Sequence, residues 1–199
     1  MEHSMTGAGR PQHRTIFGVD VEGSTERSNT AKAVYRRSLY ELVEAALHEA
    51  GIDGAIREDI DCGDGVMVLV HPVAEAPKTV LLDTVAPALS AMLAERNAQN
   101  PDHRLRLRAV LHAGEIHFDQ RGCFGEALDL AFRLLNATGT KRELRAVTAP
   151  VVLVASDDIY RGVVRHGYPG IDAQEFAPRV RVRVAGQTHR GWVRSMSPV

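Results

Sequence analysis

The order of the apolar patterns along this chain restricts the folds that it can adopt. An apolar run over 14–20 predicts a buried strand, and apolar residues near a 3.6-residue period predict a helix over 29–50 that Gly51 ends. Runs over 52–60 and 66–70, separated by Gly63, Asp64 and Gly65, predict a β-hairpin. A second helix over 79–98, which Pro87 should kink or divide, precedes a long strand over 105–116.

This order, βαββαβ, packs its two helices on one face of an antiparallel sheet. The predicted fold class is therefore α+β, with a ferredoxin-like core and an extra C-terminal helix and strands. After the core we expect a turn over 122–125, a helix over 126–137, a short strand over 151–155, a helix capped by Ser156, and strands at 179–184 and near Trp192. We expect a loosely ordered N-terminal arm over 1–13 and one domain over 14–199.

The charge and cysteine content narrow the classes of partner. The 24 basic and 25 acidic residues nearly cancel, so we expect no nucleic-acid partner. No apolar run approaches the roughly 20 residues that cross a bilayer, so we expect no membrane partner. Cys62 and Cys123 are too few for a disulfide framework; we expect two small buried thiols and a cytoplasmic protein.

Two acids lie next to predicted strands, one at the end of the first strand and one before the strand over 66–70. A βαββαβ core brings these two strand ends together. Asp20 ends the first strand, and Asp64 occupies the hairpin turn. We expect both carboxylates, with the carbonyl of Val21, to hold one or two Mg²⁺ or Mn²⁺ ions. The backbone amides of Gly23, Ser24 and Thr25 would then bind the β- and γ-phosphates of a nucleoside triphosphate. Alternatively, each acid is only a turn residue and Ser24 only caps a helix.

A third group lies on the helix predicted over 126–137. Asp129 and Arg133 are four residues apart, so they share one face of this helix. Arg133 could pair with Asp129, or its planar guanidinium could neutralise a phosphate.

Four segments, at 17–25, 63–65, 111–116 and 124–134, together resemble the motifs of the class III nucleotide cyclase catalytic domain, the adenylate and guanylate cyclase family. The resemblance covers about residues 14–159. It implies that Asp20 and Asp64 bind two metal ions, that residues 21–25 wrap the triphosphate, and that Arg133 stabilises the transition state at the α-phosphate. It also implies a head-to-tail homodimer, in which the aspartates and the arginine of one site come from different subunits.

The chain departs from the family pattern at several positions. Asp129 stands where the family has an asparagine that orients the ribose, and Ile60 and Gly122 occupy the two base-reading positions. Neither purine code is present. A purine read by other contacts and a pyrimidine, as in the bacterial branch that makes cyclic pyrimidine nucleotides in anti-phage signalling, both remain open. Arg183, with Arg181, is the nearest substitute for the family's late triphosphate-binding lysine.

The resemblance thus implies a nucleotide cyclase that converts a nucleoside triphosphate to a 3′,5′-cyclic nucleotide and pyrophosphate. Two alternatives remain: a cyclase-like domain that binds a nucleotide or a partner without turnover, and an interaction module that needs no metal. We assign His112, Glu115 and His117 to strand packing, because residues 112 and 117 point to opposite faces of a strand. The arginines at 179, 181 and 183 are expected to form a solvated strand face.

Overall fold

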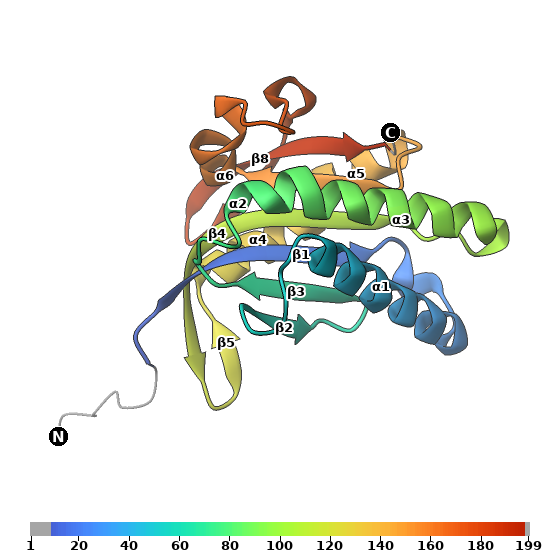
Figure 1. Ribbon diagram of the computed structural model, residues 1–199, viewed down its shortest axis with the longest axis horizontal. Helices are drawn as coiled ribbons and strands as arrows, with labels where there is room; N and C mark the ends of the chain where they lie inside the picture. The colour runs from blue at the N-terminus through green and yellow to red at the C-terminus, as the bar shows by residue number, and fades with distance from the viewer. Residues whose placement is uncertain (1–8, 198–199) are drawn as a thin grey trace.

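The structure, a computed structural model, describes residues 9–197, and in this range an eight-stranded sheet lies between two layers of helices (Figure 1). The strands are β1 (Gln12–Val21), β2 (Arg57–Asp61), β3 (Gly65–Val70), β4 (Leu107–Asp119), β5 (Gly122–Phe124), β6 (Val151–Ser156), β7 (Ala177–Val184) and β8 (Gln187–Met196). Their order across the sheet is β2-β3-β1-β4-β6-β8-β7, and β5 pairs with β4 outside this path.

The predicted α+β class and βαββαβ core are confirmed. The core consists of β1, α1 (Asn29–Glu49), β2, β3, α3 (Ala86–Gln99) and β4. β1 pairs antiparallel with both β3 and β4, and β2 pairs antiparallel with β3. These four strands have the ferredoxin-like order, and α1 and α3 cover the same face of the sheet (Figure 1).

Alternation along β1 supplies the two sides of the core. Phe17 and Val19 belong to the apolar cluster that includes residues of α1 and α3. Ile16, which directly precedes Phe17, belongs to the cluster on the other face of the sheet. Side chains that alternate across a strand produce this division. On α1, Leu39 and Val43 are buried against the first of these clusters, at the spacing of one helix turn.

A second helical layer covers the other face of the sheet. It consists of α4 (Glu126–Asn136) and α5 (Thr138–Ala146), and Leu130 and Leu134 of α4 pack there with Val110 of β4. The expectation of helices on one face therefore holds for α1 and α3 and does not extend to α4 and α5. α5 was not expected from the sequence, because only Thr140 and Leu144 of that helix are buried and they leave no clear apolar period.

The second core helix is divided, as Pro87 predicted. It runs as α2 (Lys78–Val80), a π-helical turn at Leu81–Val85, and then α3, with Pro87 in the first turn of α3. A proline is tolerated there because the amides of the first helical turn need no partner within the helix.

Several predicted boundaries were wrong, among them those of the strand expected over 105–116, which runs as β4 over Leu107–Asp119. The strand expected over 52–60 begins only at Arg57. The turn expected over 122–125 lies earlier, at Gln120 and Arg121, and Gly122–Phe124 forms β5. The cause is Asp119, whose Oδ1 accepts hydrogen bonds from the amides of Arg121, at 2.7 Å, and Gly122, at 3.0 Å, and so closes the turn directly after β4.

The C-terminal part of the chain builds the far side of the sheet. β6 runs parallel to β4, and the antiparallel pair of β8 and β7 completes the edge. Ser156 caps α6 (Asp157–Gly162), as predicted, by accepting a hydrogen bond of 3.4 Å from the amide of Ile159. β1 begins at Gln12, two residues before the predicted domain boundary at 14, and residues 1–8 of the predicted arm lie outside the described residues.

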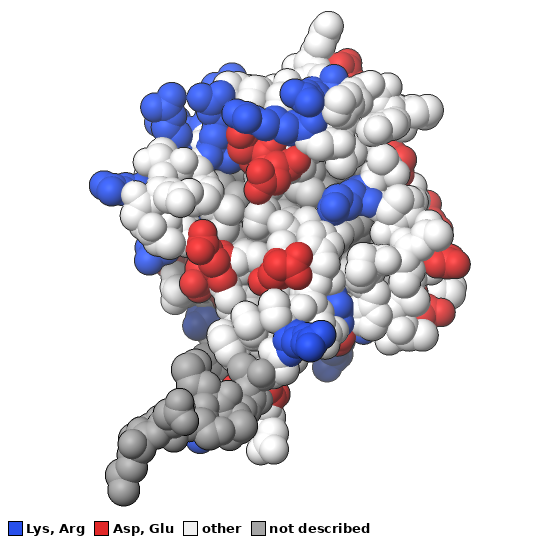
Figure 2. Space-filling model, turned by 90° about the vertical axis from the view of Figure 1, so that its left-hand side faces the viewer, with Lys and Arg blue, Asp and Glu red and all other residues white. Residues whose placement is uncertain are grey.

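The charges on one end of the molecule are mixed. Figure 2 shows basic side chains along the upper rim of this end and acidic side chains directly below them. Within residues 9–197, no helix has the length and apolar character that crossing a membrane requires.

Candidate functional site

Asp20 and Asp64 lie side by side at one end of the central strands. Asp20 pairs with Gly65 in the ladder between β1 and β3, and the amide of Val21 donates a hydrogen bond of 3.1 Å to the carbonyl oxygen of Asp64. Both acids line a cleft of about 290 Å³. The structure therefore brings together the two carboxylates that the sequence analysis placed at neighbouring strand ends.

Glycines on both sides of Asp64 allow this close approach. Gly63 has a φ of +80°, which an L side chain rarely adopts. A Cβ on Gly65 would lie 2.6 Å from the carbonyl oxygen of Val19. The hairpin turn can lie this near to β1 only because position 65 has no side chain.

Asp20 is buried and ion-paired. Arg108 of β4 donates from Nη2 to Oδ2 of Asp20. Burial raises the pKa of Asp20, the charge of Arg108 acts against this rise, and the nearby charge of Asp64 adds to it. A cation in the cleft would favour the ionised carboxylate. Arg108 binds Oδ2 of Asp20, so Oδ1 can contact such a cation.

The segment after β1 presents free amides to the same cleft. Its first residue, Glu22, donates to the carbonyl of Arg106 at 2.9 Å, and Glu26 donates to the carbonyl of Gly23 at 3.3 Å. Among the described residues, the intervening amides of Gly23, Ser24 and Thr25 have no acceptor. All three residues line the cleft, so the amides can bind an anion there.

The alternative in which Ser24 only caps a helix does not hold. Residues Ser24–Glu26 form a short 3₁₀ turn whose N-cap is Gly23, so Ser24 lies inside the turn and does not cap it. Ser28 caps α1 instead, by accepting 3.3 Å from the amide of Ala31. Ser24 is nevertheless buried at the edge of the cleft.

The donor set fits a hard divalent cation that a phosphate ligand helps to hold. Within the described part of the chain, no group of three or more His, Cys, Asp or Glu side chains could form a complete metal site. Mg²⁺ commonly uses one or two carboxylates and completes its octahedron with water and phosphate oxygens. Asp20 and Asp64 meet this requirement, and Val21 lines the cleft beside them.

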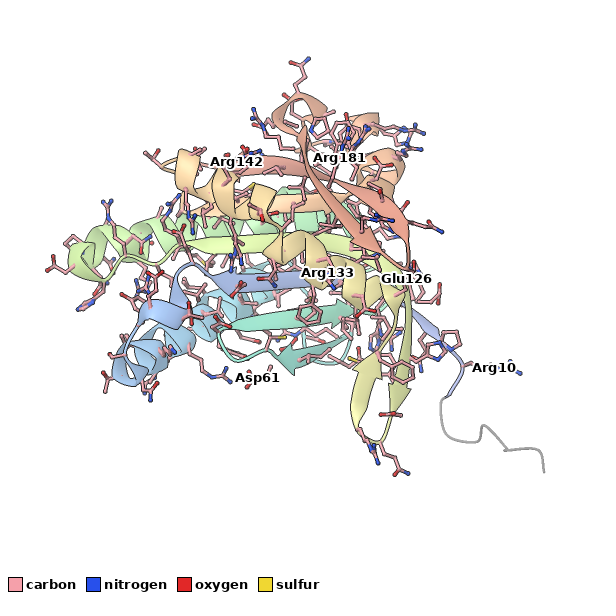
Figure 3. The ribbon with its side chains drawn as sticks, turned by 180° about the vertical axis from the view of Figure 1, so that it is seen from behind. Arg10, Asp61, Glu126, Arg133, Arg142 and Arg181 are labelled. Carbon is pink, nitrogen blue, oxygen red and sulfur yellow. The ribbon has the colours of Figure 1, made fainter. Side chains whose placement is uncertain are left out.

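Asp129 and Arg133 lie on α4 and are both exposed. Within residues 9–197 they form no ion pair with each other, so the simpler of their two predicted roles is absent here. Neither residue lines the cleft of its own chain. In Figure 3, which shows the molecule from behind, Arg133 lies on α4 in the helical layer on the viewer's side of the sheet. Their predicted roles at the α-phosphate and the ribose require a second copy of the chain.

The other predicted residues also lie outside this cleft. Arg183 is exposed on β7 and donates to the carbonyl of Gly186 at 3.4 Å. Ile60 packs against the apolar cluster under α4, and Gly122 is exposed in β5. The triphosphate role of Arg183 and the base-reading roles of Ile60 and Gly122 remain predictions.

Three cations in the cleft were not expected as site residues: Arg108, Lys141 and Arg145. The alternation of arginines with apolar residues along 105–108 could have indicated Arg108, since it places that side chain on one face of a strand that begins beside Asp20. No such signal exists for Lys141 and Arg145, because α5 has no apolar period.

The expectation that the strand histidines serve packing agrees with their surroundings. His112 is buried, with Nδ1 2.8 Å from Oγ of Ser156, and burial lowers its pKa to about 4. His117 stacks on Phe124, with ring centroids 5.2 Å apart. Cys62 and Cys123 are free and only half-buried, which is less than the buried position expected for them, and both pack against the apolar cluster under α4.

Comparisons by sequence find no family model and no curated protein that matches this chain. Comparison of structures does find relatives. A structure described as adenylate/guanylate cyclase/hydrolase from Silicibacter pomeroyi is 19% identical, with a TM-score of 0.63 over 96% of this chain and 99% of that one. The adenylyl cyclase CyaB from P. aeruginosa is 16% identical, with a TM-score of 0.59 over 94% of each chain.

A third relative contains a nucleotide. The guanylate cyclase domain of RhGC from Catenaria anguillulae, in complex with GTP, is 15% identical, with a TM-score of 0.61 over 96% of this chain and 100% of that one. At these identities the likeness shows the fold. The chain therefore has the fold of class III nucleotide cyclase catalytic domains.

Proposed function

We propose that this protein is a class III nucleotide cyclase, which converts a nucleoside triphosphate to a 3′,5′-cyclic nucleotide and pyrophosphate. One observation carries the proposal: Asp20 and Asp64 line a single cleft together with the free amides of residues 23–25. Carboxylates that bind divalent cations and amides that bind phosphate are the two kinds of group that a metal-bound triphosphate needs. The fold relatives are nucleotide cyclases, and one of them holds GTP.

In the proposed reaction the ribose 3′-hydroxyl attacks the α-phosphorus, the bond from this phosphorus to the β-phosphate oxygen breaks, and pyrophosphate leaves. Asp20 and Asp64 would hold two Mg²⁺ or Mn²⁺ ions, which when bound favour loss of the hydroxyl proton and balance charge on the phosphates. Arg108 orients Asp20 through their ion pair. The amides of residues 23–25 hold the phosphate chain in line with the attacking hydroxyl.

A homodimer would complete the site. Phe124 and Phe132 are exposed by 47% and 38%, which is unusual for aromatic side chains on a free surface. Phe132 directly precedes Arg133 on α4 and also lines the cleft, whereas Phe124 ends β5, just before α4. A second copy that covers these rings would bring its own Arg133 towards the cleft, and a two-fold arrangement would give two such sites.

Both purine and pyrimidine triphosphates are candidate substrates. Ile60 and Gly122 offer no charged group to read a base, which suits a pyrimidine cyclase of the kind used in anti-phage signalling. A purine read through other contacts is the competing assignment. Two free thiols suit the reducing cytoplasm as the place of action.

The test is to incubate the purified protein with Mn²⁺ and each of the four ribonucleoside triphosphates, and to identify products by mass. We expect one cyclic nucleotide to dominate. Asp64→Ala should lower the rate by about 100-fold or more, because it removes a group that acts on the transition-state charge. Asp102→Ala, an exposed acid in a short 3₁₀ turn after α3, is the matched control and should keep the wild-type rate.

A second candidate function is nucleotide binding without turnover. Asp129 favours it, because an acid on the exposed face of α4 would repel the triphosphate at the position where the ribose-orienting asparagine is expected. In that case a triphosphate with metal raises the melting temperature but stays intact. Absence of any cyclic product from all four triphosphates, at a concentration where the dimer is present, would sink the cyclase proposal.

A further inference from the structure

Two cations on α5 line the cleft beside the paired acids. Lys141 and Arg145 are four residues apart, so they share one face of the helix, and both contribute to the lining that includes Asp20 and Asp64. The charge of Lys141 acts on the carboxylate of Asp20. Other charged residues of α5 point elsewhere, since Glu143 pairs with Arg179 at 3.5 Å.

Neither side chain has a partner among the described residues, in which no side-chain hydrogen bond or ion pair involves Lys141 or Arg145. Two like charges at this spacing destabilise an isolated helix by a few tenths of a kcal/mol. Of the acids that line the cleft, Asp20 pairs with Arg108 and Glu22 with Arg106, whereas Asp64 and Glu26 form no ion pair among the described residues. Lys141 and Arg145 are therefore free to bind an anionic ligand, and Asp64 is free for the cations that such a ligand brings.

A third arginine couples α5 to the segment that follows β1. Arg106 donates to the carbonyls of Leu144 and Val147 at the end of α5, the latter at 2.7 Å, and its Nη1 lies 3.4 Å from Glu22. The carbonyl of Arg106 also accepts from the amide of Glu22. The position of α5 is thus fixed relative to the amides of residues 23–25.

Burial within the helix supports the same placement. Leu144 is fully buried in the cluster under α4, and Oγ1 of Thr140 donates 2.7 Å to the carbonyl of Leu134 at the end of α4. With its apolar side anchored in this way, α5 turns Lys141 and Arg145 towards the cleft.

We propose that Lys141 and Arg145 bind the terminal phosphates of the triphosphate, in the same subunit as Asp20 and Asp64, and hold the pyrophosphate as it leaves. This inference rests on the proposed function and names the phosphate subsite of that site. The planar guanidinium of Arg145 can engage two phosphate oxygens, and the ammonium of Lys141 supplies a point charge. The role predicted for Arg183 then passes to α5.

The experiment measures binding by isothermal titration calorimetry, with inorganic tripolyphosphate and a nucleoside monophosphate as separate probes in Mg²⁺ buffer. The test variant is Lys141→Gln with Arg145→Gln. Each lost charge-assisted contact should weaken tripolyphosphate binding by about tenfold or more, so we expect about a 100-fold loss in the double variant. The affinity for the monophosphate should not change.

The control has the same change in net charge at a distance from the cleft. It combines Arg142→Gln, an exposed position on α5 that Figure 3 labels, with Arg121→Gln in the turn between β4 and β5. This variant should bind tripolyphosphate as the wild type does. An equal loss in both double variants would mean that overall charge causes the effect, and it would overturn the inference.

The remaining outcomes separate the inference from the proposed function. Unchanged tripolyphosphate binding in the Lys141 and Arg145 variant, or no binding by the wild type, overturns the subsite and leaves the cyclase to the four-nucleotide assay. Selective loss of binding in a protein that yields no cyclic product supports the subsite and removes the cyclase. Thermal unfolding checks that each variant is folded.

Discussion

Two opposing effects act on the pKa of Asp20. Burial favours its protonated form, whereas Arg108 favours the charged form. Arg108 itself keeps a buried Nε without an acceptor among residues 9–197. A buried donor of this kind is costly to leave unpaired, and an anionic ligand in the cleft would satisfy it. The acids and the arginine therefore suit a ligand that brings both cations and phosphate.

His112 gives a prediction at the same scale. Its pKa is lowered from 6.5 to about 4 because burial disfavours the charged ring, an effect that Asp158 opposes and that His189 and His13 reinforce. Between these two pH values the unfolded chain binds more protons than the folded one. Neutral His112 should therefore make its full contribution to the free energy of unfolding above about pH 6.5. This free energy should fall by roughly 2–3 kcal/mol as the pH drops to about 4.

Urea unfolding at several pH values measures this effect. His112→Asn keeps a polar group near Ser156 and should flatten the pH dependence relative to the wild type. His103→Asn, at an exposed histidine, should leave the slope unchanged. An identical slope in the wild type and in His112→Asn would show that another group is responsible.

At the scale of elements, the ladder between β1 and β3 sets the distance between the two acids. Gly65→Ala would place a Cβ 2.6 Å from the carbonyl oxygen of Val19, so one of the two strands must move. We expect a loss of about 1–3 kcal/mol in the free energy of unfolding. We also expect weaker Mn²⁺ binding, because Asp64 precedes the displaced residue.

Chemical denaturation and a Mn²⁺ titration test this expectation. Gly54→Ala is the control, since a Cβ there meets nothing within 4 Å and the backbone does not require a positive φ. If Gly65→Ala unfolds at the same denaturant concentration as Gly54→Ala, the proposed constraint on the hairpin is wrong.

Elements with a clear local pattern could be predicted from the sequence. The apolar period of α1, the glycines around Asp64 and the apolar run of β1 predicted these elements and the proximity of Asp20 to Asp64. α5 could not be found in this way, because tertiary contacts of Thr140 and Leu144 hold it instead of a continuous apolar stripe. For the same reason Lys141 and Arg145 could not be recognised as residues of the cleft.

At the scale of the whole molecule, one copy of the chain holds the parts of the proposed site on separate surfaces. The acids and the phosphate-binding amides line the cleft, whereas Arg133 is exposed on α4 outside it; the ring of Phe132, the preceding residue, is 38% exposed at the edge of the cleft. Burial of that ring against another copy would remove apolar surface from water and order the arginine at the same time. The proposed cyclase reaction therefore requires two copies of the chain for each active site.

Complementation between two inactive variants tests this requirement most directly. Asp64→Ala and Arg133→Ala are purified separately, mixed under conditions that exchange subunits, and assayed with the triphosphate that the wild type converts. Each variant alone should be inactive. The mixture should recover roughly a quarter of the wild-type rate, because half of the dimers are mixed and each of these has one intact site of two. A mixture of confirmed dimers that stays inactive, or an Arg133→Ala variant that turns over by itself, would contradict the account.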